Sequence, residues 1–259
     1  MDFTLKKYKL LIEALVTNGY HFQTFKDFLE NQHEGKTIIL RHDVDLKPGN
    51  SLSTAVTEHE LGIEASYYFR AVPESWDEDI IKKTAALGHE IGYHYESLTT
   101  ANGDIDKAYA DFVGNLSKLN SLLNPSNHCQ TICMHGSPRS PYDSKDIWKK
   151  YSYKELNIIG EPYFDMDFSK TFYLTDTGRR WDGYNVSVRD KIPVYQDEWT
   201  RKGLVFHKTD DIIKAANAGD LPDVVMITTH PQRWTDDGLL WMKEFFFQNI
   251  KNVVKFFYC

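Results

Sequence analysis

The sequence predicts an α/β fold, a single-domain distorted (β/α)7-type barrel with parallel strands, from two observations. Short runs of β-branched and aromatic residues alternate with segments of helical periodicity, which is the pattern of successive βα units. The chain has 259 residues, 41% of them hydrophobic, and no Gly/Pro/Ser-rich linker divides it. Since one barrel core accommodates a chain of this length, we expect one domain over residues 1–259, with N-terminal helices in residues 1–34 packed on the barrel.

Eight segments have the length and composition of strands, and six have apolar residues spaced three and four apart, as in amphipathic helices. The expected strands are residues 37–42, 65–70, 90–94, 130–134, 156–160, 171–175, 204–207 and 224–229. The expected helices are residues 51–61, 77–87, 105–123, 145–151, 210–218 and 236–249. Residues 161–196 lack a regular pattern, so we expect long loops or an added hairpin there.

Charge and hydropathy exclude several classes of partner. The chain has 30 basic and 37 acidic residues, a net charge of -7, and no basic run that could follow a phosphate backbone, so nucleic acid is not an expected partner. Nowhere does an uncharged apolar run approach the roughly 18 residues that span a bilayer, so we expect no membrane insertion. The N-terminus reads as an amphipathic helix rather than a signal, which favours a cytoplasmic location. The oligomeric state is not predicted.

The cysteines do not predict a disulfide framework or a metal knuckle. The chain has three cysteines, an odd number, and Cys129 and Cys133 are four residues apart rather than in a CxxC pair. We therefore expect buried, reduced thiols.

Carboxylates follow the first predicted barrel strand. Asp43 and Asp45 come directly after the apolar run 37–40, and in extended backbone residues two apart point to the same side. One carboxylate could then bind a metal while the other accepts a proton. The alternative is a loop pair that caps the helix expected to begin at Ser51.

Histidines end three further predicted strands. His94 ends the run 90–94, His135 follows 130–134, and His230, held extended by Pro231, follows 224–229. Each alone could be a hydrogen-bonded polar residue without function. Because active sites of such barrels lie at the C-terminal ends of the strands, four strands that each deliver Asp or His favour one common site. Imidazole and carboxylate together suit Zn²⁺ and neighbouring metals.

These motifs resemble those of the polysaccharide deacetylases, carbohydrate esterase family 4, from residue 37 to residue 234. The most specific match is the Gly-His-Glu-Ile-Gly-x-His stretch that ends at His94, followed in the family's order by the Arg-Ser-Pro-Tyr run from Arg139 and the His-Pro pair at His230. The resemblance implies a metal-dependent hydrolase that removes an acetyl group from an acetylated carbohydrate. It also implies Asp43 as general base, His230 as general acid and Arg139 as the arginine that orients the base.

Two family ligand positions carry apolar residues, Val44 and Leu98. We therefore assign the metal, a divalent ion that we expect to be Zn²⁺, to Asp45, His94 and His135. Glu96 is a second choice in place of His135.

Further residues are assigned to the substrate and to the acid. Backbone N–H groups near Tyr142 are expected to stabilise the oxyanion, and Trp181 and Trp234 are candidates for stacking on a sugar ring, with packing in the core as the alternative. Asp176 resembles the family's fourth motif.

Two other functions stay open on the sequence. The apolar residues at the ligand positions are compatible with a catalytically inactive, sugar-binding member of the family. A metal-dependent amide hydrolase acting on a substrate other than a sugar would present similar motifs on a similar barrel.

Overall fold

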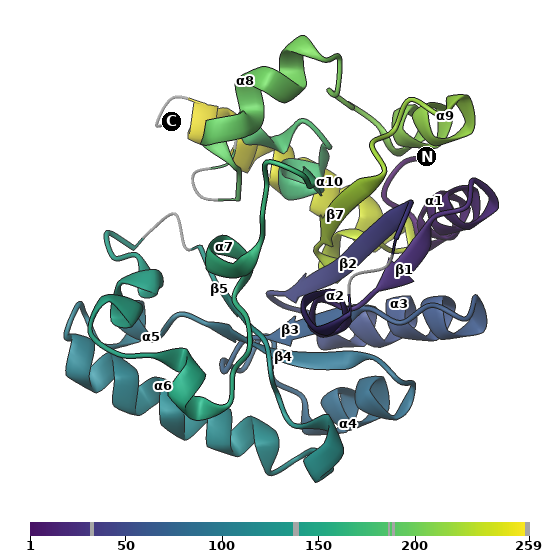
Figure 1. The fold of residues 1–259 in the computed structure, drawn as a ribbon. Helices are drawn as coiled ribbons and strands as arrows, with labels where there is room; N and C mark the ends of the chain where they lie inside the picture. The colour runs from purple at the N-terminus through teal and green to yellow at the C-terminus, as the bar shows by residue number, and fades with distance from the viewer. Residues whose placement is uncertain (32–33, 137–139, 186, 188–189, 257–259) are drawn as a thin grey trace.

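Seven parallel strands form one curved sheet in a computed structural model that describes residues 1–256, without 32–33, 137–139, 186 and 188–189 (Figure 1). The strands are β1 (His21–Gln23), β2 (Thr37–Val44), β3 (Ser66–Phe69), β4 (Glu90–Tyr95), β5 (Ile132–Met134), β6 (Phe172–Thr175) and β7 (Val224–Thr229). Their spatial order is β5-β4-β3-β2-β7-β6, and β1 pairs with β2. Every pairing is parallel. The strands curl into a half-barrel, which confirms the predicted fold class.

Strand β2 lies at the centre of the sheet and has three neighbours. One edge pairs with β7 from Thr37 to His42, while the other pairs with β1 near its start and with β3 from Arg41 to Val44. All eight of its residues are buried. The site carboxylates Asp43 and Asp45 therefore lie at the C-terminal end of the most enclosed strand of the molecule.

Two predicted strands are wrong. Residues 156–160 make only a single bridge, between Thr131 and Gly160, because a 3-10 turn (Tyr153–Leu156) ends with Asn157 in the left-handed region and leaves little extended chain. Residues 204–207 form no strand, and the amide of His207 donates to the Asp211 carboxylate at the start of the next helix. Strand β1 was not predicted.

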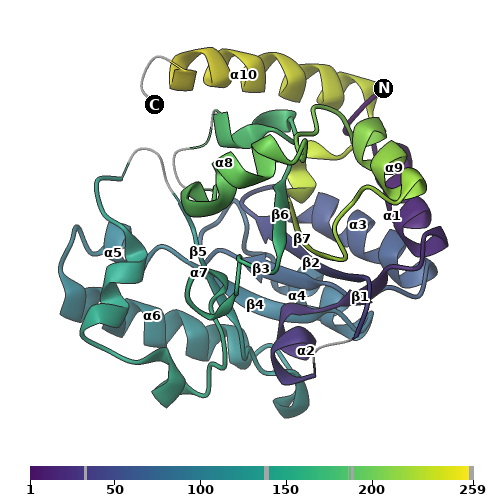
Figure 2. The ribbon, with the colours of Figure 1, turned by 45° about the horizontal axis from the view of Figure 1, so that its top comes forward.

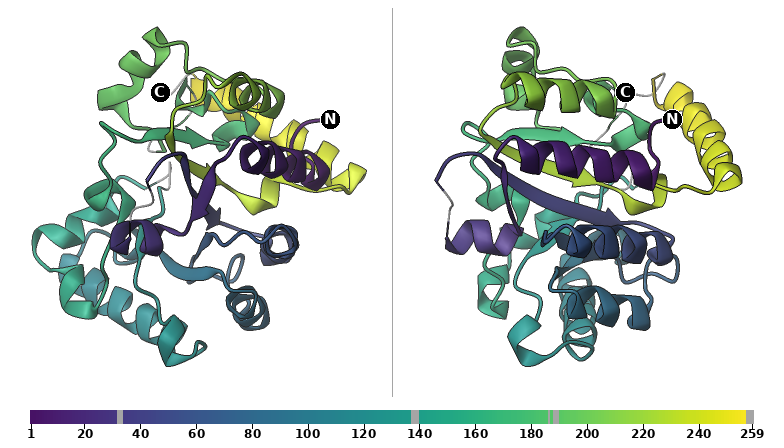
Figure 3. Two further views of the ribbon diagram at one scale, coloured as in Figure 1. Left: turned by 45° about the vertical axis from the view of Figure 1, so that its right-hand side comes forward. Right: turned by 90° about the vertical axis from the view of Figure 1, so that its right-hand side faces the viewer.

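Helices cover both faces of the sheet and mostly match the predicted segments (Figure 3). They are α1 (Leu5–Thr17), α2 (Phe25–Glu30), α3 (Pro48–Glu60), α4 (Glu78–Ala86), α5 (Ser97–Thr100), α6 (Ile105–Asn120), α7 (Pro162–Asp165), α8 (Pro193–Arg201), α9 (Thr209–Ala218) and α10 (Gly238–Phe256). Residues 145–151, predicted as a helix, are largely a 3-10 helix (Ser144–Lys149), and α8 extends beyond the segment expected to be irregular. None of the described helices is long and apolar enough to cross a membrane.

Local packing explains two features of the sequence. Gly92 in β4 is required, since a Cβ atom there would lie 2.3 Å from the ring of Tyr68 and 3.0 Å from the carbonyl oxygen of Thr131. Cys129 and Cys133 are buried free thiols, as expected, whereas Cys259 lies outside the described residues.

Candidate metal centre and acid–base site

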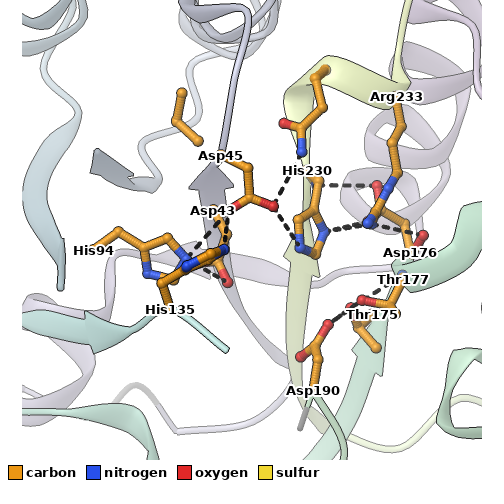
Figure 4. A network of polar contacts seen from close by, with 12 residues as sticks. Asp43, Asp45, His94, His135, Thr175, Asp176, Thr177, Asp190, His230 and Arg233 are labelled. Atoms are coloured by element: carbon orange, nitrogen blue, oxygen red, sulfur yellow. Dashed lines mark hydrogen bonds and ion pairs between the residues drawn. The ribbon is translucent and has the colours of Figure 1, made fainter. Parts of the chain in front are cut away.

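The C-terminal ends of β2, β4, β5 and β7 bring the predicted Asp and His residues together (Figure 4). Asp45 lies between two groups of side chains. His94, near the end of β4, and His135, just after β5, approach it from one side, while His230, just after β7, approaches from the other. The strand-end pattern read from the sequence therefore corresponds to one cluster in space.

The first group consists of acceptor atoms that face one another. Asp45 Oδ1 lies 3.5 Å from Nε2 of His94 and 3.5 Å from Nε2 of His135. This oxygen is buried and has no hydrogen-bond partner among the residues that the structure describes. One atom from each of the three residues lies within 4.8 Å of the others, a spacing that allows them to hold one ion.

Hydrogen bonds at the far side of each ring set the tautomers. His94 Nδ1 lies 2.9 Å from the carbonyl oxygen of Cys133, and His135 Nδ1 lies 2.9 Å from Oε2 of Glu96. Both partners can only accept from a neutral ring, so Nδ1 carries the proton in each histidine. The Nε2 lone pairs therefore point toward Asp45, as in metal-ligating histidines that donate their other N–H to an oxygen.

Glu96 holds His135 and is itself held by an arginine. Arg70 Nη2 donates to Glu96 Oε1 at 2.6 Å. Burial favours the neutral acid, but the hydrogen bond and charge of His135 and the charge of Arg70 outweigh it and lower the pKa of Glu96 to about 2. Glu96, the second choice as a ligand, thus stays ionised and contacts the outer nitrogen of His135.

These three residues fit a divalent metal. Two imidazole lone pairs and an unpartnered carboxylate oxygen converge without a donor between them, and a cation satisfies all three. Zn²⁺ binds N and O ligands at 2.0–2.2 Å, which places tetrahedral ligands roughly 3.5 Å apart. The two Asp45 distances of 3.5 Å match that separation. Asp45 also has a pKa well below its usual range, because the contact with His94 and the charge of His135 outweigh the effect of burial.

Asp43 belongs to a neighbouring group that already contains a cation. Nη2 of Arg41 donates to Asp43 Oδ2 at 2.9 Å and Oδ1 at 3.1 Å, and lies 2.9 Å from Cys133 Sγ. Asp43, His94 and Cys133 are also spaced closely enough for an ion, but the guanidinium neutralises this set. Burial opposes ionisation of Asp43, yet the charges of Arg41 and His94 lower its pKa. Asp43 is therefore an ionised carboxylate 3.8 Å from His94 Nε2.

His230 is held by a carboxylate from the adjacent strand end. Its Nδ1 lies 2.6 Å from Asp176 Oδ1, and its backbone amide donates to Asp176 Oδ2 at 3.0 Å. Asp176 also accepts from Nη1 of Arg233 at 2.5 Å and from the indole nitrogen of Trp234 at 2.7 Å. The Nε2 atom of His230 is left facing Asp45 Oδ2 at 3.9 Å.

The charges around His230 favour its protonated form. Burial and the nearby Arg233 lower its pKa, but the charge and hydrogen bond of Asp176 and the charge of Asp45 raise it more, so the pKa of His230 lies above its usual value. Burial similarly opposes ionisation of Asp176, but Arg233 and His230 hold its pKa at about 2. This shift favours a proton on the ring, whose Nε2 is the nitrogen that faces Asp45.

A further carboxylate, Asp190, fixes the chain beside β6. It accepts hydrogen bonds from the hydroxyl groups of Tyr173, Thr175 and Thr177, the contact with Thr175 measuring 2.6 Å. Figure 4 shows Asp190 on the same side as His230. These contacts hold the segment after β6, which carries Asp176.

The residues assigned to substrate are spread over different environments. Trp181 and Trp234 are 3% and 2% exposed and pack near each other and Phe3. The indole of Trp181 donates to Thr209, whereas that of Trp234 binds Asp176. Tyr142 is half-buried, and its amide donates to Ser140 Oγ at 3.2 Å.

Three other sequence positions are placed as follows. Arg139 lies outside the described residues. Val44 is fully buried and points to the opposite side of β2 from Asp43 and Asp45, as alternation requires. Leu98 packs in a small apolar cluster with Ala108 and Ile147.

Sequence reasoning gave no role to several residues that complete the site. Arg41 lies on the same side of β2 as Asp43. Its position two residues before Asp43 is the signal in the sequence that could have identified it. Arg233 lies three residues after His230 on the same short 3-10 segment (Pro231–Arg233). Gln232 donates to Asp45 Oδ2 at 3.3 Å, and its side chain carries no charge that would have drawn attention.

Comparisons with known proteins return structures but no sequence match. No family model and no curated protein matches the sequence. Among solved structures, a carbohydrate esterase family 4 pseudoenzyme from Bacillus anthracis aligns with 86% of this chain at 11% identity and a TM-score of 0.43. A family 4 carbohydrate esterase from the same organism aligns with 95% of this chain and 86% of its own, at 11% identity and a TM-score of 0.41.

A peptidoglycan N-acetylglucosamine deacetylase aligns with 82% of this chain and 80% of its own, at 15% identity and a TM-score of 0.39. This chain spans 62% of the length of the pseudoenzyme. Scores and identities this low assign no activity to the chain, so its chemistry has to be argued from its own residues.

Proposed function

We propose that this protein is a metal-dependent deacetylase that removes an acetyl group from a carbohydrate. One observation carries the proposal: Asp45, His94 and His135 turn three acceptor atoms toward one point, with the Asp43 carboxylate on one side and the His230 imidazole on the other. A metal site with a general base on one side and a general acid on the other can catalyse the hydrolysis of an amide or ester.

In this proposal the metal is Zn²⁺, and Asp45, His94 and His135 would hold it. The chemistry that the bound ion supplies is acidification of a water molecule and polarisation of the acetyl carbonyl. Glu96 and the Cys133 carbonyl keep the two Nε2 lone pairs turned inward through the Nδ1 protons. Arg70 keeps Glu96 charged, so the orientation of His135 does not depend on pH in the neutral range.

Asp43 is proposed as the general base. Arg41 orients both of its oxygens and stabilises the carboxylate, so it is ready to accept a proton from the attacking water. In this chain Arg41 orients the base from the same strand, a role that the resemblance gives to Arg139.

His230 is proposed as the general acid. Its Nε2 faces the cluster while Asp176 holds Nδ1, and the charges of Asp176 and Asp45 raise the pKa of the ring above its usual value, which favours the protonated form. It then delivers a proton to the leaving nitrogen or oxygen of the sugar. Backbone N–H groups near Tyr142 remain candidates for the oxyanion, although the amide of Tyr142 itself is bonded to Ser140.

The substrate class rests on the motif resemblance to carbohydrate esterase family 4. An inactive sugar-binding role is the second candidate, and it is favoured by Val44 and Leu98 at two ligand positions of that family.

Metal analysis and acetate release test the proposal together. Purified protein is expected to contain one divalent metal per chain, to release acetate from N- or O-acetylated sugars, and to lose and regain this activity on chelation and Zn²⁺ addition. The carbohydrate substrate is contradicted if the protein contains metal and hydrolyses small non-sugar amides but releases acetate from no acetylated sugar. Neither metal nor turnover contradicts the enzyme and supports the sugar-binding role, which sugar-induced thermal stabilisation then checks.

A further inference from the structure

Helix α10 turns its polar side toward the protein and its apolar side outward. Its large apolar side chains are unusually exposed: Leu239 is 76%, Leu240 42%, Met242 47%, Phe245 41%, Phe246 65%, Phe247 56%, Ile250 62% and Val253 59% exposed. Figure 2 shows α10 at the periphery, and no drawn element lies on its outer side. Phe245 stacks on Trp241 beside Arg179, on the inward side of the helix, and we call the other seven residues the α10 apolar face. A contiguous apolar surface of this kind marks a site of interaction.

The inward side explains why the helix has this orientation. Gln248 is 6% exposed, and Asn252 donates to the carbonyl oxygen of Gly178 at 2.8 Å. Glu244 pairs with Lys47 at 3.6 Å. The guanidinium of Arg179 lies over the ring of Trp241, 4.7 Å from its centroid. These contacts occupy the polar stripe of α10. They fix the orientation of the helix, which leaves the apolar face exposed.

We propose that the α10 apolar face binds the surface of a phospholipid bilayer. The width of the face is the first argument. Residues that follow one another in a helix are about 100° apart, so the seven side chains of the face, from Met242 at one border to Leu240 at the other, spread over about 160° of the circumference. A partner helix covers a stripe about 100° wide and would leave some of these side chains in water. A bilayer interface immerses the whole convex side.

Lysine within the face is the second argument. Lys243 falls between Phe246 and Phe247 around the helix, and Lys251 lies nearer one border; both are exposed. Neither is ion-paired among the described residues. A protein interface would bury the ammonium of Lys243 at a cost, whereas at a membrane its long side chain reaches lipid phosphates while its methylene groups stay in the apolar layer.

The remaining charges do not oppose this placement. Glu244, the acidic residue within the described side chains of α10, faces inward on Lys47. The chain as a whole has a net charge of -7, but its repulsion from an anionic surface is screened over a Debye length of about 8 Å at physiological salt. The attachment is peripheral, with the helix lying in the plane of the headgroups, and it is compatible with the finding that no described helix spans a membrane.

Vesicle flotation with the full chain tests the proposal. The protein is expected to float with phosphatidylcholine vesicles and more tightly with vesicles that also contain phosphatidylglycerol. The double variant Phe246→Glu/Ile250→Glu is expected to reduce the partition coefficient by roughly tenfold or more for each side chain. The matched control is Leu10→Glu/Val16→Glu on α1, where two apolar side chains are 50% and 45% exposed and the added charge is the same. Thermal melting establishes that both variants are folded.

Several outcomes overturn the proposal. Wild-type protein that floats with neither kind of vesicle excludes a lipid surface, and equal flotation of Phe246→Glu/Ile250→Glu and wild type excludes the α10 apolar face. A dimer in light scattering that this variant disperses, without vesicle binding, assigns the face to a second copy of the chain. The assay requires no turnover, so its result is independent of the proposed deacetylase function.

Discussion

The two histidine groups on either side of Asp45 differ in how their polar atoms are satisfied. His94 and His135 are bonded only at Nδ1, and their Nε2 atoms meet an Asp45 oxygen that has no partner. His230 instead belongs to a group in which Asp176 accepts from His230, Arg233 and Trp234. Among the described residues the first group has no cationic side chain bonded to it, whereas the second contains Arg233. The proposed roles follow this difference, with an ion held by the first group and a proton held by His230 in the second.

Loss of a ligand in the unsatisfied group is expected to have the largest effect. His94→Ala removes one of three proposed ligand atoms, so we expect loss of stoichiometric metal and, with it, of acetate release. Metal content by elemental analysis measures the first effect and acetate release the second. His128→Ala, at an exposed position, is the control and should retain both. Unchanged metal content in His94→Ala would move the site away from this group.

Asp43→Asn tests whether the base is distinct from the metal ligands. The amide cannot accept the proton of water, so turnover is expected to fall by about a hundredfold to ten thousandfold while the metal stays bound. Metal content and kcat are measured in the same preparation of the variant and compared with those of the wild type. Full activity would show that Asp43 is only the partner of Arg41.

The second group is tested by Asp176→Asn. Protonated His230 is present below its pKa and is lost as pH rises through it, and Asp176 is a main cause of the raised pKa. Its neutralisation should therefore move the alkaline limb of the kcat profile to lower pH and reduce turnover about tenfold or more at neutral pH. Metal content should not change. An alkaline limb at the wild-type position would contradict the assignment of His230 as the acid.

The smallest effect is expected from the residue that orients a ligand. Glu96→Gln removes the charge that accepts from His135 Nδ1 but leaves the three proposed ligands intact. Such changes weaken metal affinity roughly tenfold to a hundredfold. Competition with a chelating dye gives the affinity. If Glu96→Gln instead abolishes binding, Glu96 itself is a ligand in place of His135.

The sequence predicted the strand ends well because periodicity and buried composition are local. Asp43, Asp45, His94, His135 and His230 meet because parallel strands place their C-terminal ends at one edge. The choice between His135 and Glu96 was not predictable, since both follow strand ends within reach of Asp45. Only the hydrogen bond between Glu96 and His135 Nδ1, which joins residues far apart in the chain, shows that the two side chains take different positions in the site.

Other features depend on sheet order rather than on sequence pattern. Asp176 reaches His230 because β6 pairs with β7, a contact between residues 54 positions apart. The periodicity of the C-terminal segment predicted an amphipathic helix but not which side it packs. In α10 the polar side faces inward, because Asn252 donates to Gly178 and Glu244 pairs with Lys47, both on other parts of the chain, while Gln248 donates to Asn252 within the helix.

The three neighbours of β2 have a consequence for hydrogen exchange. One edge of the strand is bonded to β7 over Thr37–His42 in register, and β1 and β3 share the other edge. Amides enclosed on both edges exchange with solvent only when the whole domain opens. The amides of β2 are therefore expected to be among the slowest in the molecule to take up deuterium. Asp43 then lies on, and Asp45 just beyond, the segment least subject to local opening.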